Sequence, residues 1–190
     1  SQTGFAPVAQ GFHPTLVQGD AGRDDLRTLG ARQGEVSSSV TFVVSAFNRT
    51  DGGLLWEYTI QAEGALTPVH RKHNLASASP VTDGNLVYAW FGTGQIVALD
   101  MDGKLVWSRN LSLEYTAFGI VWGHASSPVL HDDLLILLCD HETEAYMVAL
   151  DTLTGVERWK VDRGAGLRSY STPSVVPGLS GEQLMVNSSI

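Results

Sequence analysis

Short apolar runs separated by turns follow one another along most of this chain. Between residues 36 and 46, Val40, Phe42 and Val44 alternate with their neighbours, and this period of two predicts a β-strand. Residues 134–139 form a continuous apolar run instead, which is typical of a strand covered on both faces. The pattern of apolar and polar positions therefore predicts an all-β chain.

One pattern, Ala-x-Asp-x-x-Thr-Gly-x-x-x-Trp, stands in full at residues 149–159 and recurs in looser form at 46–56 and, one residue shorter, at 98–107. In each copy a Trp follows a Gly by four places, and the three Trp residues are 51 and 52 residues apart. A fixed period of this size, built of short strands and Gly turns, predicts radially repeated β-sheets. The residues that carry the pattern are Ala149, Asp151, Thr154, Gly155, Trp159, Asp100, Gly103, Trp107, Gly52 and Trp56.

The residue types in this pattern suit a tight turn between two antiparallel strands. Gly155 tolerates a positive φ, and the Asp151 carboxylate can accept hydrogen bonds from backbone N–H groups of the turn. Ala149 leaves room for an aromatic neighbour, while Trp159 offers a large apolar face and one N–H donor. We interpret the Trp residues as packing groups between sheets rather than as ligand-stacking groups.

The pattern resembles the tryptophan-docking motif of quinoprotein-type β-propellers, the family named after pyrroloquinoline quinone (PQQ), and the resemblance covers residues 40–190. It implies a propeller of four-stranded antiparallel blades in which each Trp ring docks between neighbouring blades. The same family holds PQQ- and calcium-dependent dehydrogenases beside non-enzymatic scaffolds, so the resemblance is specific for the fold and weak for the function.

The repeat also predicts how the chain is organised. We expect residues 1–35 to be irregular or a degenerate blade, and residues 36–190 to form a partial propeller with blade ends near Trp56, Trp107 and Trp159 and a truncated last blade. Three prolines, 48 and 45 residues apart, mark the first strand of successive blades: Pro80, Pro128 and Pro173. Only about half a ring is present, so we expect the chain to be a fragment of a longer protein, or two copies to complete one ring.

Composition narrows the function. The chain of 190 residues has 12 Lys and Arg against 20 Asp and Glu, with a net charge of −8 and no basic stripe, which argues against nucleic-acid binding. No apolar run approaches the ~20 residues of a membrane span. No secretory signal is visible. The family resemblance nevertheless implies a periplasmic or extracellular protein.

The segments just before the first strand of each blade converge at the mouth of a propeller's channel. There the sequence predicts a polar and aromatic rim that binds a protein partner or a small anionic or carbohydrate-like ligand, with Arg168 and His124 donating hydrogen bonds. The alternative, which we favour, is that these groups satisfy turn backbones and bridge blades. The candidate residues are His73, Asn74, Trp122, His124, Arg168 and Tyr170.

The sequence offers two candidate sites for a metal or cofactor. Resemblance to the PQQ enzymes implies calcium held by Glu, Asn and Asp, but no residues of this sequence can be matched one by one to those calcium ligands. Many of these enzymes also have a disulfide between adjacent cysteines, which the single Cys139 cannot form. Asp140, His141 and Glu142 with Glu144 resemble a metal cluster, yet we expect a solvated hairpin turn, and we predict no metal site.

We therefore expect a non-catalytic binding and interaction module. A sensor domain attached to a signalling protein is a third reading. The main alternative is a PQQ- and calcium-dependent dehydrogenase of alcohols or sugars, whose catalytic residues the sequence does not identify. PQQ and calcium are expected as cofactors only under this alternative.

Overall fold

The computed structural model describes residues 12–17, 40–64, 70, 74–120, 122–179 and 181–189, with residues 12–17 described by their backbone alone. Within these ranges the chain is almost entirely β-structure. One four-residue helix, α1 (Leu111–Glu114), follows the seventh strand. Asn110 caps this helix, because its side chain accepts hydrogen bonds from the backbone N–H groups of Ser112 and Leu113.

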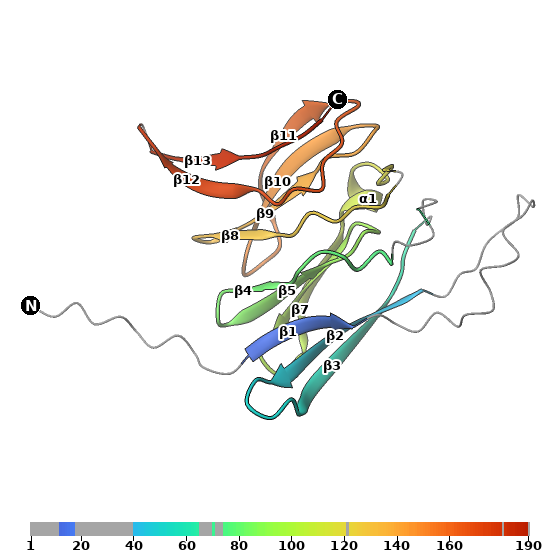
Figure 1. Ribbon diagram of the computed structural model, residues 1–190, viewed down its shortest axis with the longest axis vertical. Coiled ribbons are helices and arrows are strands. Elements are labelled where there is room, and N and C mark those ends of the chain that lie inside the picture. The colour runs from blue at the N-terminus through green and yellow to red at the C-terminus, as the bar shows by residue number, and fades with distance from the viewer. Residues whose placement is uncertain are drawn as a thin grey trace, which may run out of the picture.

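Two four-stranded antiparallel sheets, which we call blade 2 and blade 3, occupy the middle of the molecule (Figure 1). In both, the strands lie side by side in chain order, so each strand pairs with the next along the sequence. Blade 2 consists of β4 (Val81–Thr82), β5 (Leu86–Trp90), β6 (Gln95–Asp100) and β7 (Leu105–Asn110). Blade 3 consists of β8 (Val129–His131), β9 (Leu134–Cys139), β10 (Ala145–Asp151) and β11 (Glu157–Gly164).

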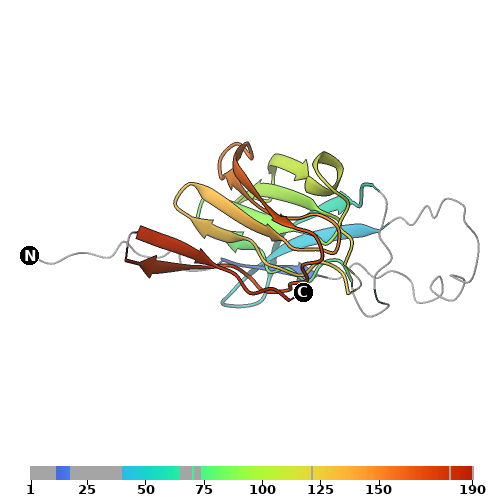
Figure 2. The same cartoon turned by 90° about the horizontal axis from the view of Figure 1, so that it is seen from above.

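The two outer sheets have fewer strands. Blade 1 contains β1 (Phe12–Val17), β2 (Thr41–Asn48) and β3 (Leu54–Gln61), and blade 4 contains β12 (Ser174–Gly178) and β13 (Gly181–Met185). The four blades are stacked along the molecule and fan out when seen from above (Figures 1 and 2). The predicted fold, an all-β propeller of four-stranded antiparallel blades with about half a ring present, is confirmed.

The division at residue 35 stays a prediction. β1 lies within residues 1–35, the segment that we expected to be irregular or a degenerate blade, and it pairs with β2 over its whole length. The rest of that segment lies outside the described residues.

The core lies between the faces of successive blades. Phe42 and Val44 of blade 1 pack against a face of blade 2 that includes Val97 and Leu99. The opposite face of blade 2 packs against blade 3, where Leu137 is completely buried. Each such side chain stabilises the fold by about 1.5–3 kcal/mol. Because a stacked blade has neighbours on both sides, the run 134–139 needs no polar face.

Trp side chains connect the outer strand of one blade to a turn of the next. Trp56 Nε1 donates a hydrogen bond of 2.9 Å to the Met101 carbonyl oxygen, and a Cβ added at Gly103 would lie 2.6 Å from the Trp56 ring. Trp107 Nε1 donates likewise to the Thr152 carbonyl oxygen at 2.9 Å, with its ring against Gly155. The predicted docking function of these residues stays a prediction, which a pair of Gly variants tests below.

A second set of contacts joins the blades near their first strands. The Ser79 N–H donates to Ser127 Oγ at 2.9 Å, and the Ser127 N–H donates to Thr172 Oγ1 at 3.1 Å. These residues stand immediately before Pro80, Pro128 and Pro173, and each proline precedes the first strand of its blade. Equivalent positions of the repeat thus form a chain of hydrogen bonds from blade to blade.

Candidate functional site

Aromatic side chains from the loops that precede blades 2, 3 and 4 gather in one place, two of them exposed and that of His70 half-buried. The Trp122 side chain is 55% exposed, and its ring lies 4.1 Å from the ring of His70, centroid to centroid. Tyr170 is 43% exposed, and its hydroxyl contacts the backbone of Trp122. We call His70, Trp122 and Tyr170 the aromatic ledge. Three successive blades each contribute one ring to it.

One ion pair flanks the aromatic ledge. Arg168 Nε lies 3.2 Å from Glu142 Oε1, and the Arg168 side chain is 60% exposed. The pKa of Tyr170 is raised, mainly because the hydroxyl is partly buried, and the charge of Glu142 adds to this effect. The hydrogen bond to the Trp122 backbone and the Arg168 charge act in the opposite direction. The tyrosine therefore stays protonated at neutral pH. The site offers flat apolar faces beside one cation and one anion.

The other candidates from the sequence lie elsewhere. His124 is 2% exposed; its Nε2 lies 2.8 Å from the Leu138 carbonyl oxygen and its ring 4.4 Å from that of Trp90. Asn74 closes a local turn, because its Oδ1 accepts a hydrogen bond of 3.0 Å from the Ala76 N–H. His73 lies outside the described residues. The structure thus brings together Trp122, Arg168 and Tyr170, and not His124.

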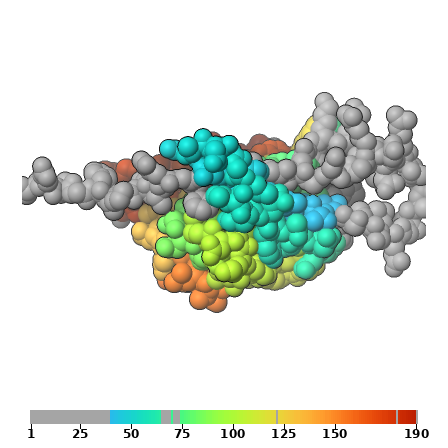
Figure 3. Space-filling model, turned by 90° about the horizontal axis from the view of Figure 1, so that it is seen from below, coloured from blue at the N-terminus to red at the C-terminus, as the bar shows by residue number. Residues whose placement is uncertain are grey.

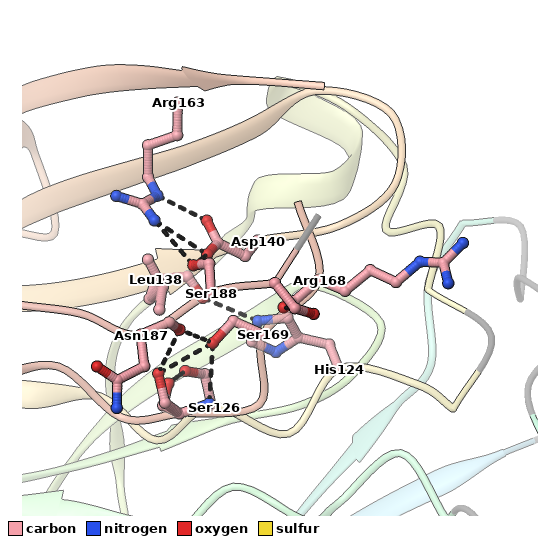
Figure 4. A network of polar contacts seen from close by, with 11 residues as sticks. His124, Ser126, Leu138, Asp140, Arg163, Arg168, Ser169, Asn187 and Ser188 are labelled. Carbon is pink, nitrogen blue, oxygen red and sulfur yellow. Dashed lines mark hydrogen bonds and ion pairs between the residues drawn. The ribbon is translucent and has the colours of Figure 1, made fainter. Parts of the chain in front are cut away.

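The Asp140 carboxylate lies at the junction of blade 3 with the segment after β13 (Figure 4). Arg163 Nε donates to its Oδ1 at 2.7 Å, and the Ser188 hydroxyl donates to its Oδ2. Because Arg163 Nη2 also donates to Ser188 Oγ at 2.9 Å, the three side chains form a closed polar group. This group holds the C-terminal segment against blade 3.

The expectation of a solvated turn at residues 140–144 is wrong for its first two residues. Asp140 and His141 are both 0% exposed. Burial lowers the pKa of His141, although the charges of Asp140 and Glu144 oppose this effect. The reason is tertiary: side chains from segments distant in sequence, such as Arg163 and Ser188, surround Asp140. Alternation along the hairpin carries no information about such neighbours.

Serine hydroxyls tie the loops of blades 3 and 4 to backbone carbonyl groups. Ser126 donates to the Ser171 carbonyl oxygen, and Ser169 donates to the Asn187 carbonyl oxygen at 2.5 Å (Figure 4). Ser171 Oγ donates to the same Asn187 oxygen at 2.9 Å. These hydroxyls satisfy buried backbone groups, which is a structural task.

The described residues show no cluster for calcium, the ion that accompanies PQQ in the dehydrogenases. No three of their His, Cys, Asp and Glu side chains gather closely enough to hold a metal ion. Asp140 is paired with Arg163, and Glu142 with Arg168. Cys139 is buried, and burial raises the pKa of its thiol well above the ordinary value. We therefore derive no reaction step through either cofactor.

Two residues of the site were not selected from the sequence. His70 stands in the loop before blade 2, among residues that converge on the channel mouth, and only the tertiary structure shows that its ring packs against that of Trp122. Glu142 belongs to the acidic hairpin of residues 140–144 rather than to the predicted rim. The ion pair of its carboxylate with Arg168 joins residues 26 positions apart, and a one-dimensional pattern does not indicate such a pair.

Comparison with known proteins gives a family. A family model described as outer membrane protein assembly factor BamB matches residues 40–190. A protein of that name from Kangiella koreensis is 30% identical over 117 residues, which is 61% of this chain and 26% of the relative. One from Moranella endobia is 28% identical over 118 residues, 62% of this chain and 26% of the relative. The chain spans about a quarter of the length of these relatives.

Similar solved structures include quinohemoprotein alcohol dehydrogenase ADHIIG from Pseudomonas putida HK5. It is 20% identical with a TM-score of 0.48, and the match covers 64% of this chain and 18% of that one. BamB from Moraxella catarrhalis is 16% identical with a TM-score of 0.36, and the match covers 77% of this chain and 57% of that one. Within the described ranges no helix is long and apolar enough to cross a membrane. On the family model, which matches residues 40–190, the chain belongs to the PQQ-like repeat family described as outer membrane protein assembly factor BamB.

Proposed function

We propose that this chain is a non-catalytic binding module that engages a protein partner of the bacterial envelope through the aromatic ledge. The observation that carries the proposal is the exposure of Trp122 and Tyr170, at 55% and 43%, on neighbouring loops. Exposed Trp and Tyr rings are over-represented among the residues that dominate protein interfaces, because each buries a large rigid area at little entropic cost.

The polar groups of the rim divide into two kinds. Asn74, His124 and Ser169 bond to nearby backbone groups, as expected if the rim only satisfies its own turns. Trp122 and Tyr170 leave much of their ring surface exposed. Beside them, the Arg168–Glu142 pair offers one charge of each sign at the rim, where charged groups fix orientation more than affinity.

The name that the two curated relatives share supports a partner from outer membrane protein assembly. Both curated relatives are called outer membrane protein assembly factors, and we extend to this chain a role in that assembly and a periplasmic location. Among the described residues, no cluster of His, Cys, Asp and Glu side chains could hold the calcium ion of the alternative, a PQQ- and calcium-dependent dehydrogenase.

Photo-crosslinking from the ledge tests the proposal. A photoreactive amino acid at position 122, in the protein expressed in its own cell envelope, is expected to give one discrete adduct with a protein of outer membrane assembly, identified by mass spectrometry. The control carries the same amino acid at Leu179, which is fully exposed on the turn between β12 and β13. Identical adducts from both positions, or none from position 122, would contradict the proposal.

A titration with PQQ in the presence of calcium tests the alternative. We expect no saturable quenching of tryptophan fluorescence. Quenching that saturates and disappears on addition of a chelator would contradict a non-catalytic function and would justify a screen of alcohol and sugar substrates.

A further inference from the structure

The hairpin of residues 140–144, which joins β9 to β10, contacts the loop that carries Trp122. The Glu142 N–H donates a hydrogen bond of 2.9 Å to the Gly119 carbonyl oxygen. Thr143 Cγ2 lies 3.7 Å from the position that a Cβ would take at Gly119. Gly119 stands three residues before Trp122 in the sequence, so the hairpin supports the loop from which this ring projects.

The same hairpin contacts the loop that carries Arg168 and Tyr170. The Gly166 N–H donates a hydrogen bond of 3.1 Å to the Glu142 carbonyl oxygen, and Glu142 Oε1 lies 3.2 Å from Arg168 Nε. Glu142 thus bonds through its N–H to the loop before blade 3, and through its carbonyl and carboxylate to the loop before blade 4. Because Trp122 stands on the first loop and Tyr170 on the second, the hairpin sets the spacing of these two rings.

His141 packs the hairpin against its neighbours. Successive blades lie side by side, in blue-green, green and orange in Figure 3, and the His141 ring is buried where blade 3 meets the loop that leaves blade 2. This ring lies 5.4 Å from that of Phe118 and 6.0 Å from that of Tyr146, centroid to centroid. Its Nδ1 lies 2.9 Å from Thr143 Oγ1, whereas its Nε2 has no hydrogen-bond partner among the described residues. A protonated ring in this place would bury a charge and leave one N–H without an acceptor.

The charges around His141 do not replace the missing partner. The Asp140 carboxylate is already engaged by Arg163, and burial raises the pKa of Tyr146, so its hydroxyl stays neutral. Burial therefore outweighs the two carboxylates of Asp140 and Glu144 and lowers the pKa of His141. The titratable or charged groups of the segments around this ring are Asp140, Glu142 and Glu144 of the hairpin, Cys139 and Tyr146 of β9 and β10, Lys160 and Arg163 of β11, and Tyr115 and His124 of the loop before blade 3.

We propose that the hairpin of residues 140–144 holds the Trp122 and Tyr170 rings of the aromatic ledge in register, and that protonation of His141 opens the hairpin and weakens binding at the ledge. The inference rests on the function proposed for the ledge and adds its regulation by pH. His141 packs on Phe118 and Tyr146 rather than on the ledge, so it is a positioning residue that acts through the rest of the hairpin.

The direction of the effect follows from the protonation of the two states. In the closed hairpin the pKa of His141 is below 6.5, and an open hairpin exposes the ring and restores the ordinary value. Between these two pKa values the open form binds a proton that the closed form does not bind. The open population therefore grows about tenfold for each unit by which the pH falls. Above about pH 6.5 neither form is protonated, and the population is constant.

Amide hydrogen exchange in the free protein tests the opening. The amides of Glu142 and Gly166, which join the hairpin to the two loops, should lose protection about tenfold per pH unit below about pH 6.5. They should also be less protected than the amides of β9, because the hairpin opens without unfolding blade 3. Protection that does not change with pH, or that equals the protection of β9 at every pH, would overturn the proposal.

Histidine variants separate the proton from the packing. His141→Phe keeps a flat ring in the same place but cannot titrate, so protection at Glu142 should stay constant from about pH 7.5 to 5, a range above the ordinary pKa values of Asp and Glu. His141→Gln is a second variant that does not titrate and should behave alike. His131→Gln removes a histidine that pairs with Glu182 at 2.9 Å and should keep the original dependence. A folded His141 variant that keeps this dependence would refute the assignment.

A fluorine probe reports on the ledge itself in the free protein. Fluorotryptophan gives Trp122 a resonance that is assigned by its loss in Trp122→Phe, and His70→Gln is introduced to remove the histidine that lies against this ring. We expect the resonance to shift below about pH 6.5 and to stay in place when His141→Phe is added. A resonance that does not respond to pH would show that the hairpin does not hold the ledge.

Photo-crosslinking from position 122 tests the consequence for binding. In cell envelopes buffered at about pH 7.5 and about pH 5.5, the yield of adduct should fall about threefold or more at the lower pH, and His141→Phe should retain it. Equal yields at both pH values would overturn the regulation. No adduct at the higher pH contradicts the function proposed for the ledge instead, because the exchange and fluorine measurements use the free protein and judge the hairpin separately.

Discussion

At the scale of single residues, glycine is needed where the chain turns and a ring covers the turn. Gly155 has a φ of +70°, and an added Cβ would lie 2.8 Å from the Trp107 ring. Both the backbone conformation and the space therefore exclude a side chain. Gly166 has the same kind of backbone, with a φ of +79°, but apart from its chain neighbours no atom of the described residues lies within 4 Å of its Cβ position.

Comparing these two glycines separates the energetic cost of a left-handed backbone from the cost of displacing the Trp107 ring. Gly166→Ala should lower the free energy of unfolding by about 1 kcal/mol, the cost of a left-handed conformation. Gly155→Ala should cost about 1–3 kcal/mol more, because the Trp107 ring must move. Urea denaturation measures both, and equal losses would contradict a docking function for the ring.

His141 couples stability to pH. Its buried ring lies 5.4 Å from that of Phe118, and its Nδ1 lies 2.9 Å from Thr143 Oγ1. Burial lowers the pKa of His141 below its ordinary value of 6.5. Between the two pKa values the unfolded chain binds more protons than the folded one, so stability falls as the pH falls.

We expect the urea midpoint of the protein to be constant above about pH 6.5 and to decline as the pH drops toward 5. His141→Gln should remove much of this decline, because glutamine does not titrate. His131→Gln serves as the control, since that ring pairs with Glu182 at 2.9 Å on the surface. A decline of the same size in His141→Gln would contradict the assignment.

At the scale of elements, a buried ion pair fixes β11 to the end of β9. Asp140 is 0% exposed, and the Arg163 side chain, which pairs with it, is 20% exposed. Arg158 offers a more exposed comparison, since it pairs with Asp133 at 3.2 Å and with Asp151 at 2.9 Å and its own side chain is 45% exposed. Loss of Arg163 leaves a buried carboxylate without a paired charge, whereas loss of Arg158 leaves the carboxylates of Asp133 and Asp151, which water and the hydrogen bonds of the turn at Asp151 still stabilise.

Arg163→Met should therefore lower the free energy of unfolding by about 3–5 kcal/mol, and Arg158→Met by about 1 kcal/mol or less. Adding Asp140→Asn to Arg163→Met should recover part of the loss, because the buried charge is then gone. Thermal or urea unfolding of the three variants measures this. A double variant as unstable as Arg163→Met would show that the pair acts through packing rather than charge.

At the scale of the whole molecule, the blades form a row in which each contacts only its neighbours. Blades 2 and 3 are covered on both faces, and most of β5, β6, β9 and β10 is buried. The two strands of blade 4 are largely exposed or half-buried. In such arrays stability is set by the junctions of each unit with its neighbours.

Amide hydrogen exchange should be slower in the buried middle blades than in blade 4. We expect the slowest exchange in β5, β6, β9 and β10 and much faster exchange in β12 and β13, because a blade with one neighbour opens locally at lower free energy. Uniform protection across all four blades would instead indicate a single cooperative unit.

Much of the fold could be predicted from local rules. The period of 51 and 52 residues between Trp56, Trp107 and Trp159, the Gly turns and the prolines before first strands each depend on neighbours in sequence. The family resemblance added the propeller, which the structure confirms. The candidate site was predictable only as a region, from the loops that precede each blade.

The sequence by itself determined the strands, their turns and the repeat, because turn geometry and strand periodicity arise within a few residues. Only the tertiary structure decided which groups of the rim stay exposed, and that Asp140 and His141 are buried. These facts depend on residues brought together from blades about 50 positions apart, where desolvation and packing act between surfaces rather than along the chain.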